Sequence, residues 1–153
     1  DLLGRKVLMQ HGKTLQLYLA EVRATIEEAG KFPILEPHAR DLSEGLDKLL
    51  QVTSHLVALS KRKGPEHFLA DATLYLELFG IVSIAWQWLV QAVAVLRALD
   101  KELAAGEKDF YQGKLYAFRY FFGYELPKIE GLVKRLMNSD GLTVEMQEAF
   151  FHD

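Results

Sequence analysis

The sequence contains no cysteine, and it has only four prolines and two tryptophans in 153 residues. Without cysteine the chain forms no disulfide, has no thiolate nucleophile and offers no sulfur ligand to a metal, which fits a reducing compartment. The net charge is also small, at −3, so the chain has no general attraction to phosphate backbones or anionic lipid. These absences argue against a disulfide-bonded secreted domain and a nucleic-acid-binding module, and they predict a cytoplasmic location.

The sequence also lacks the short motifs of several enzyme classes. It has no Gly-x-Ser-x-Gly elbow, no glycine-rich phosphate loop and no His-Glu-x-x-His motif. A di-metal carboxylate site would need two Glu-x-x-His pairs on facing helices, and these are missing too. The pairs His67 with Asp71 and Glu148 with His152 have a four-residue spacing that charged helix surfaces produce by chance. We therefore predict no catalytic, cofactor-binding or metal-binding residue in this chain.

One stretch is long and apolar enough to resemble a membrane span. Residues 78–96 carry no formal charge, yet Gln87 and Gln91 lie one turn apart within them, and Trp86 and Trp88 sit in the middle instead of at the ends. We interpret this stretch as a buried helix and predict no membrane span. The chain begins at Asp1 without a methionine or a basic and apolar leader, so we expect a piece of a larger protein and no secretory signal.

Apolar residues recur at three- and four-residue spacing in four long segments and alternate in none, which predicts an all-α chain. The economical arrangement is an up-down bundle of about four long helices in a single domain, residues 1–153. The first helix is expected over about residues 13–29, and the second is expected to end at about Arg62. The third should run from Pro65 towards Leu103, and the fourth from Tyr111 to Leu136. We expect the third and fourth to be the longest. The third should bend near Gly80 or project, and the fourth should kink at Pro127, which lacks a hydrogen-bond donor.

The most informative segment is residues 110–127, which hold eight of the 17 aromatic residues of the chain. Its apolar residues fall on more than one side of a helix, so we expect one face to pack inside the domain and another to contact a partner. The predicted interface consists of Tyr116, Tyr120, Phe121 and Tyr124, with Trp86 and Trp88 as weaker candidates. The basic run Lys61-Arg62-Lys63 lies at a predicted helix end, where cations favour the helix dipole in any protein.

The order of three motifs resembles the C-terminal end of a bacterial acyl-CoA dehydrogenase. They are Asp1-Leu2-Leu3-Gly4-Arg5-Lys6, the segment Leu74-Tyr75-Leu76-Glu77-Leu78-Phe79-Gly80, and the run from Phe110-Tyr111 through Lys114-Leu115 and Arg119-Tyr120-Phe121-Phe122 to Leu126-Pro127. The similarity spans the whole chain. The chain is similar to a subgroup that carries an extra helical C-terminal domain and includes enzymes named for 3-methylmercaptopropionyl-CoA.

The resemblance implies an FAD-dependent parent oxidoreductase that removes the α and β hydrogens of an acyl-CoA thioester. In that family the glutamate base lies in a Tyr-Glu-Gly-Thr segment just upstream of the stretch that corresponds to residues 1–6, and other domains hold most of the flavin and thioester contacts. The resemblance therefore implies that this chain is inactive by itself and serves packing and assembly, with the remaining domains and a homo-oligomer as its partners. In such relatives the added helices occupy space where simpler members place a second dimer.

Two alternatives from other classes remain open. The first is a helical module that binds a small apolar ligand in a pocket between the third and fourth helices, lined by Trp86, Val90, Phe118 and Phe122. The second is an adaptor that binds an unrelated protein through the same aromatic residues.

Overall fold

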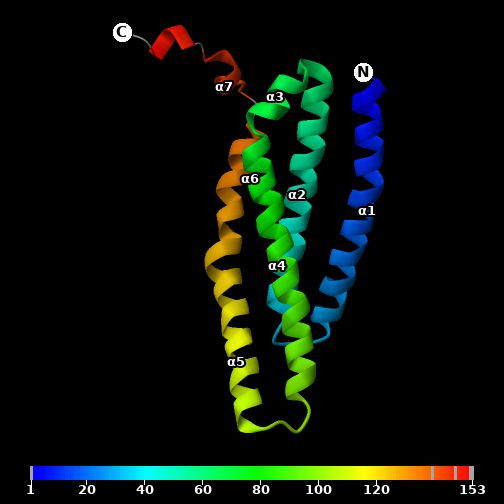
Figure 1. Cartoon of the computed structure of the whole chain (residues 1–153), viewed down its shortest axis with the longest axis vertical. Coiled ribbons are helices and arrows are strands. Elements are labelled where there is room, and N and C mark those ends of the chain that lie inside the picture. Colours follow the sequence, from blue (N-terminus) through cyan, green and yellow to red (C-terminus); the bar gives the residue numbers. More distant parts are fainter. Residues whose placement is uncertain (1, 139, 147, 152–153) are drawn as a thin grey trace. The chain divides into compact units, whose positions relative to one another are not determined.

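The computed structural model describes residues 2–138, 140–146 and 148–151, and every element within them is helical (Figure 1). The prediction of an all-α chain is therefore confirmed. The elements are α1 (Leu2–Gly30), α2 (Glu36–Lys63), α3 (Pro65–Ala70), α4 (Ala72–Leu99), α5 (Ala105–Tyr120), a π-helix (Phe121–Glu125), a 3-10 helix (Leu126–Lys128), α6 (Ile129–Met137), α7 (Leu142–Glu145) and a last 3-10 helix (Glu148–Phe151).

Two predictions are corrected: the number of long helices and which of them are the longest. Five α-helices of the described residues are long, with 29, 28, 28, 16 and 9 residues in α1, α2, α4, α5 and α6. The first helix is the longest because it begins at Leu2, well before the apolar stripe that marks its later turns. Pro37 does not interrupt α2 but lies in its first turn, where a missing backbone donor costs nothing.

The expected third helix is divided at Asp71. Its start at Pro65 is confirmed, but α3 ends after six residues, and the Asp71 N–H caps it by bonding the carbonyls of Leu69 and Phe68. The chain restarts at once as α4, which continues through Gly80 and ends at Leu99. The break in the expected third helix therefore lies at Asp71, before Gly80, where the sequence predicted a bend.

The fourth expected helix changes its hydrogen-bond pattern near Pro127. The Leu126 N–H bonds the Phe121 carbonyl, five residues back, and a 3-10 helix containing Pro127 follows. Because proline has no N–H to donate, the regular α pattern is lost locally and resumes as α6. A bend of the helix axis at this point stays a prediction.

The chain divides into two compact units, each with its own buried apolar residues. Unit 1 comprises Asp1–Ser43 and Trp86–Phe118. Its α1 and α4 meet at Trp86, whose indole N–H donates to Thr25 Oγ1 at 2.9 Å and whose ring meets Tyr18 edge-on at 5.6 Å. The buried apolar residues of this unit are Val22, Ala29, Leu35, Ala39, Leu42, Leu89, Ala92, Val93, Val95 and Phe118.

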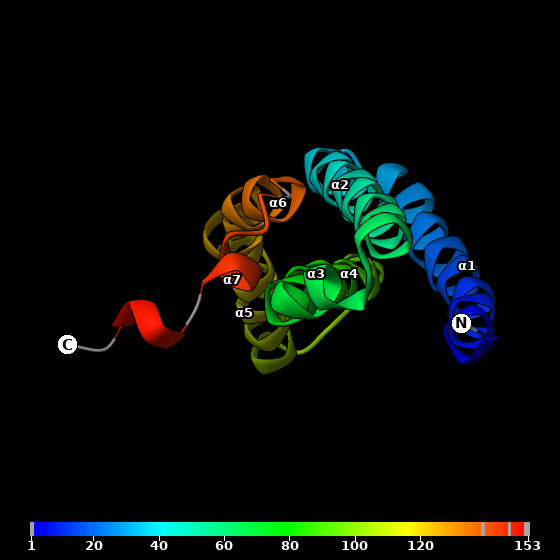
Figure 2. The same cartoon turned by 90° about the horizontal axis from the view of Figure 1, so that it is seen from above.

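Unit 2 comprises Glu44–Ala85 and Arg119–Asp153. Its buried apolar residues recur every three or four positions on α2 and α4, which is the spacing of one helix face. They are Leu46, Leu49, Val52, Leu56, Leu59, Leu78, Val82, Ala85, Phe122, Leu126, Ile129 and Leu136. Seen from above, α3 and α7 lie against each other within this unit (Figure 2).

Helix α4 is the one helix among the described residues that could cross a membrane by length and composition. This is weak evidence, because the core helix of a soluble protein passes the same test. The absence of a membrane span stays a prediction.

Candidate docking surface

The aromatic segment has a buried side and an exposed side, as its pattern predicts. Phe118 is buried in unit 1 and Phe122 is buried in unit 2, each with 5 % or less of its surface exposed. In contrast, Tyr116, Tyr120 and Tyr124 are 66 %, 57 % and 67 % exposed. Large aromatic side chains that remain this exposed are typical of surfaces that contact a partner.

Tyr120 and Tyr124 form an ordered pair on the surface of unit 2. Their rings stack with centroids 4.6 Å apart and an angle of 17° between the ring planes. The pair lies where α5 passes into the π-helix, so both side chains project from continuous helical backbone. Because each ring restricts the other, the two tyrosines lose less conformational freedom on docking than two separate side chains would.

An ion pair borders the stacked tyrosines. Lys128 Nζ donates to Glu125 Oε2 at 2.8 Å. This hydrogen bond is the main reason why the pKa of Lys128 is raised, and the charges of Tyr120 and Glu77 act in the same direction. The surface of unit 2 therefore combines a flat aromatic area with a polar edge, which is the usual composition of protein–protein contacts.

The other predicted interface residues are less exposed. Phe121 lies between buried and exposed, as do Trp86 and Trp88. Trp86 makes its hydrogen bond and its edge-on contact within unit 1, which gives it a structural role there. The role of all six residues in an interface stays a prediction, and the exposed tyrosines fit it best.

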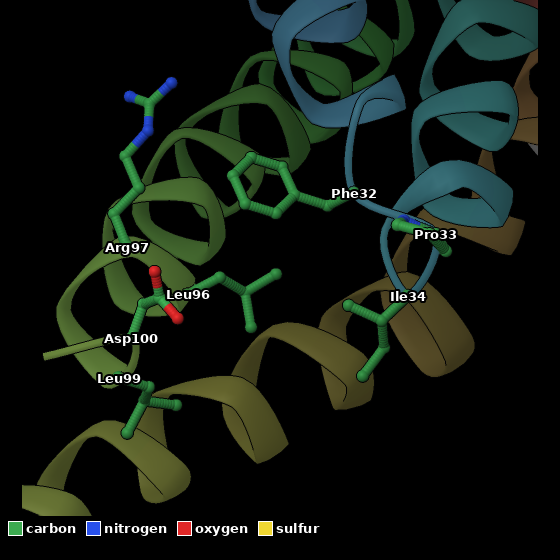
Figure 3. Close-up of a pocket in the computed structure, with 7 residues that line it drawn as sticks. All are labelled: Phe32, Pro33, Ile34, Leu96, Arg97, Leu99 and Asp100. Atoms are coloured by element: carbon green, nitrogen blue, oxygen red, sulfur yellow. The ribbon is translucent and has the colours of Figure 1, made fainter.

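Unit 1 contains an open cleft of about 590 Å³ between the α1–α2 connection and the C-terminal turn of α4 (Figure 3). Its walls are mostly apolar, and Arg97 at its edge extends away from the hollow and lies over the Phe32 ring, 5.9 Å from its centroid. Arg97 also pairs with Glu28, which Lys31 engages at 3.1 Å. The lining residues are Phe32, Pro33, Ile34, Leu96, Arg97, Leu99 and Asp100.

The four residues of the predicted ligand pocket do not line this cleft. Phe118 and Phe122 are buried in different units, whereas Val90 is 40 % exposed. Trp86 is engaged with Thr25.

The cleft lacks a positive charge directed at a diphosphate such as that of FAD. Of the two charged residues in its lining, Arg97 extends away from the hollow, and Asp100 at the C-terminal end of α4 repels anions. Within the described part of the chain there is also no group of three or more carboxylate or histidine side chains placed to hold a metal ion. Of the two chance pairs, the first has its Asp71 3.8 Å from Arg135, and the second includes His152, which lies outside the described residues.

A charged network at the α7 end of unit 2 was not predicted from the sequence. The Arg135 guanidinium contacts both oxygens of Asp140 at 3.2 Å, and its Nη2 lies 3.8 Å from the buried Asp71. Asp140 Oδ1 accepts the Leu142 N–H at 3.0 Å. The Asp140-Gly141 turn was the available signal, because aspartate and glycine favour such positions, but a single sequence does not show that Arg135 would reach it.

Comparison with known protein families adds one finding. A family model described as acetyl-CoA dehydrogenase C-terminal like matches residues 18–147. No curated protein matches the chain. The family match covers most of both units, including the stacked tyrosines.

Proposed function

The chain belongs to the acetyl-CoA dehydrogenase C-terminal-like family, and we propose that it is the C-terminal helical domain of a larger, cytoplasmic, FAD-dependent acyl-CoA dehydrogenase. In this proposal the domain serves packing and assembly. The catalytic glutamate, the main flavin site and the acyl-CoA site belong to the other domains of the parent enzyme. The absence from this sequence of every catalytic motif considered above supports this division of labour.

The observation that carries the assembly role is the exposed, stacked pair of Tyr120 and Tyr124. Aromatic side chains supply much of the binding energy of protein contacts, because they bury a large area at a low cost in conformational entropy. We assign this pair as the centre of the surface that contacts the remaining domains or another subunit. The subgroup of the family and the acyl chain of the substrate follow from the parent enzyme and not from this domain.

The proposal is tested by replacing Tyr120 and Tyr124 with serine in the full-length protein. Both side chains are more than half exposed, so the helical content and the melting temperature of the domain should hardly change. The dissociation constant for assembly, measured by light scattering on dilution, should rise at least tenfold. These positions are better targets than Phe121, because a change at the partly buried Phe121 would also disturb the fold.

A matched control replaces Leu17 and Phe110 with serine. These side chains are 68 % and 61 % exposed and lie in unit 1, so the control removes a similar apolar area elsewhere. The control should leave assembly unchanged. An unchanged dissociation constant in the tyrosine variant, or an equal loss in both variants, would contradict the proposal.

A second candidate function follows from the cleft of unit 1. Its volume of about 590 Å³ and its apolar walls are in the range of small-molecule sites. In this alternative the module binds a small apolar ligand independently of a parent enzyme. Saturable binding of an apolar dye that is lost in a Leu96→Glu variant would support it, and equal dye binding in both proteins would dismiss it.

A further inference from the structure

The C-terminal segment of the chain exposes an unusual amount of apolar surface. Leu142 and Met146 are 56 % and 48 % exposed, and Phe150 and Phe151 are 68 % and 67 % exposed. Single exposed apolar residues are common, but four large ones within ten positions are characteristic of a contact surface. The chain's own helices leave these four side chains largely uncovered.

The same segment is acidic. All 18 basic residues lie at or before Arg135, whereas Asp140, Glu145, Glu148 and Asp153 follow it. Asp140 is engaged by Arg135, but Glu145 is exposed and takes part in none of the ion pairs found among the described residues. We call Leu142, Glu145, Met146, Phe150 and Phe151 the acidic tail.

The root of the acidic tail is fixed to unit 2. Asp140 is held by two contacts of 3.2 Å from Arg135, and it accepts the Leu142 N–H at 3.0 Å. Gly141 adopts φ 68°, and a Cβ there would lie 3.4 Å from Nε2 of His67 in α3. The tail therefore starts from a defined position beside α3, as Figures 1 and 2 show.

A complementary surface lies at the junction of α2 and α3 in the same unit. Lys61, Arg62 and Lys63 end α2, all three are exposed, and none takes part in an ion pair found in the described part of the chain. Helix α3, which follows directly, has no buried residue, and its Leu69 is 66 % exposed. Glu66 is the one acidic residue between 61 and 70, so this surface is positive. We call Lys61, Arg62, Lys63 and Leu69 the basic end.

We propose that two copies of this chain associate by reciprocal exchange, so that the acidic tail of each copy docks on the basic end of the other. Glu145 would face the three cations, and the apolar residues of the tail would cover Leu69 and the open side of α3. A two-fold axis relates the two tail-to-basic-end contacts, so both are satisfied within one dimer. The association therefore stops at two copies and does not continue into a filament. The inference does not depend on the proposed function, because it uses neither Tyr120 nor Tyr124.

Charge complementarity selects a second copy as the occupant. The positive and the negative surface are both carried by unit 2, and the described ion pairs include neither Glu145 nor the three cations. Each copy therefore brings both halves of the contact. A charge-paired contact between exposed groups should weaken as salt screens it, so dimerisation should be strongest at low ionic strength.

The test is a charge swap in the full chain, followed by sedimentation velocity at low salt. The wild type should sediment as a dimer at micromolar concentrations. The variant Lys61→Glu/Arg62→Glu/Lys63→Glu should raise the dimer dissociation constant at least tenfold. Adding Glu145→Lys and Glu148→Lys to that variant should bring the constant back to within about threefold of wild type, because the two surfaces are again opposite in sign.

Two further proteins complete the test. Lys13→Glu/Lys101→Glu/Lys108→Glu makes the same change in net charge at exposed positions of unit 1, and it should leave the dimer intact. Phe150→Ser/Phe151→Ser removes apolar tail surface without touching α2, so it should weaken the dimer even if the triple reversal disturbs the end of α2. A monomeric wild type, an unaffected dimer in the tail variant, or a swapped protein that stays dissociated would each overturn the proposal.

Discussion

At the scale of single residues, unit 2 contains a partly buried polar contact between Thr53 and Tyr75. The Tyr75 hydroxyl lies 2.6 Å from Thr53 Oγ1, and Thr53 also donates to the Leu49 carbonyl at 2.7 Å. Burial raises the pKa of Tyr75, and its hydrogen bond with Thr53 offsets only part of this effect. The contact therefore joins α2 to α4 while the phenol remains protonated.

We predict that Tyr75→Phe and Thr53→Val differ in cost. Tyr75→Phe removes one hydroxyl but leaves Thr53 bonded to Leu49, so it should lower the free energy of unfolding by about 0.5–1.5 kcal/mol. Thr53→Val leaves the partly buried phenol without this partner and should cost more, about 1–3 kcal/mol. Urea denaturation measures both values, and the reverse order would show that the contact does not stabilise the fold.

The raised pKa of Tyr75 also predicts a loss of stability in alkali. An unfolded tyrosine ionises near pH 10.0. Because the folded protein holds the proton more tightly, the stabilisation is fully present below pH 10.0 and is lost as the pH rises through the folded pKa. The decrease in the free energy of unfolding above this pH should be smaller in Tyr75→Phe than in wild type. Equal decreases in the two proteins would contradict the assignment.

The Arg135–Asp140 contact makes an opposite prediction for acid. The hydrogen bond from Arg135, followed by that from the Leu142 N–H, lowers the pKa of Asp140 below 3.8. A lowered pKa contributes stability above the unfolded value and loses it as the pH falls through the folded value. The amide resonance of Leu142 should therefore shift only below pH 3.8 in wild type. In Asp140→Asn this acid-dependent shift should be absent.

At the scale of elements, the sequence predicted those features that depend on local periodicity. The helical class, the start at Pro65 and the two-sided aromatic segment follow from the spacing of apolar residues and from proline at a helix start. The break at Asp71 could not be predicted, because no glycine or proline marks it. The partner of the buried Asp71 carboxylate is Arg135, which is distant in sequence. The acidic tail was also missed, since exposure depends on what the rest of the chain covers.

Two helical glycines allow a direct comparison of propensity with packing. A Cβ at Gly80 in α4 would meet nothing within 4 Å, so Gly80→Ala should stabilise by about 0.5–1 kcal/mol through helix propensity. A Cβ at Gly45 in α2 would lie 3.3 Å from Ile129 Cδ1, so that side chain must shift. Gly45→Ala should therefore gain less than Gly80→Ala or lose stability. Thermal unfolding measures the difference in stability between the two variants. An equal gain in both would show that the Ile129 side chain moves aside without a cost in free energy.

At the scale of the whole molecule, family membership and the surface carry different information. The family match over residues 18–147 identifies the kind of domain. The surface describes what this chain offers to partners, namely the stacked tyrosines, the basic end and the acidic tail. Sequence reasoning reached the tyrosines because eight aromatics lie in one segment. It could not show that the basic run and the apolar tail belong to the same unit.

A prediction at this scale concerns the flavin. If the main flavin site lies in other domains, excess FAD should not change the melting temperature of this chain. A ligand at a hundredfold excess over its dissociation constant would add about 2.7 kcal/mol, which would raise the melting temperature of a domain of this size by about 5–10 °C. A shift of that size would show that this domain carries a flavin site of its own.

The contact of Trp86 with Thr25 and Tyr18 makes the protein suitable for optical measurements without a label. There are only two tryptophans, so replacing Trp88 with phenylalanine would leave one indole, placed between α1 and α4 of unit 1. Its emission would shift to longer wavelength when α1 separates and water reaches the ring. Since the chain has no cysteine, a single thiol introduced on α1 could carry an acceptor dye, and energy transfer would then report the same separation as a distance.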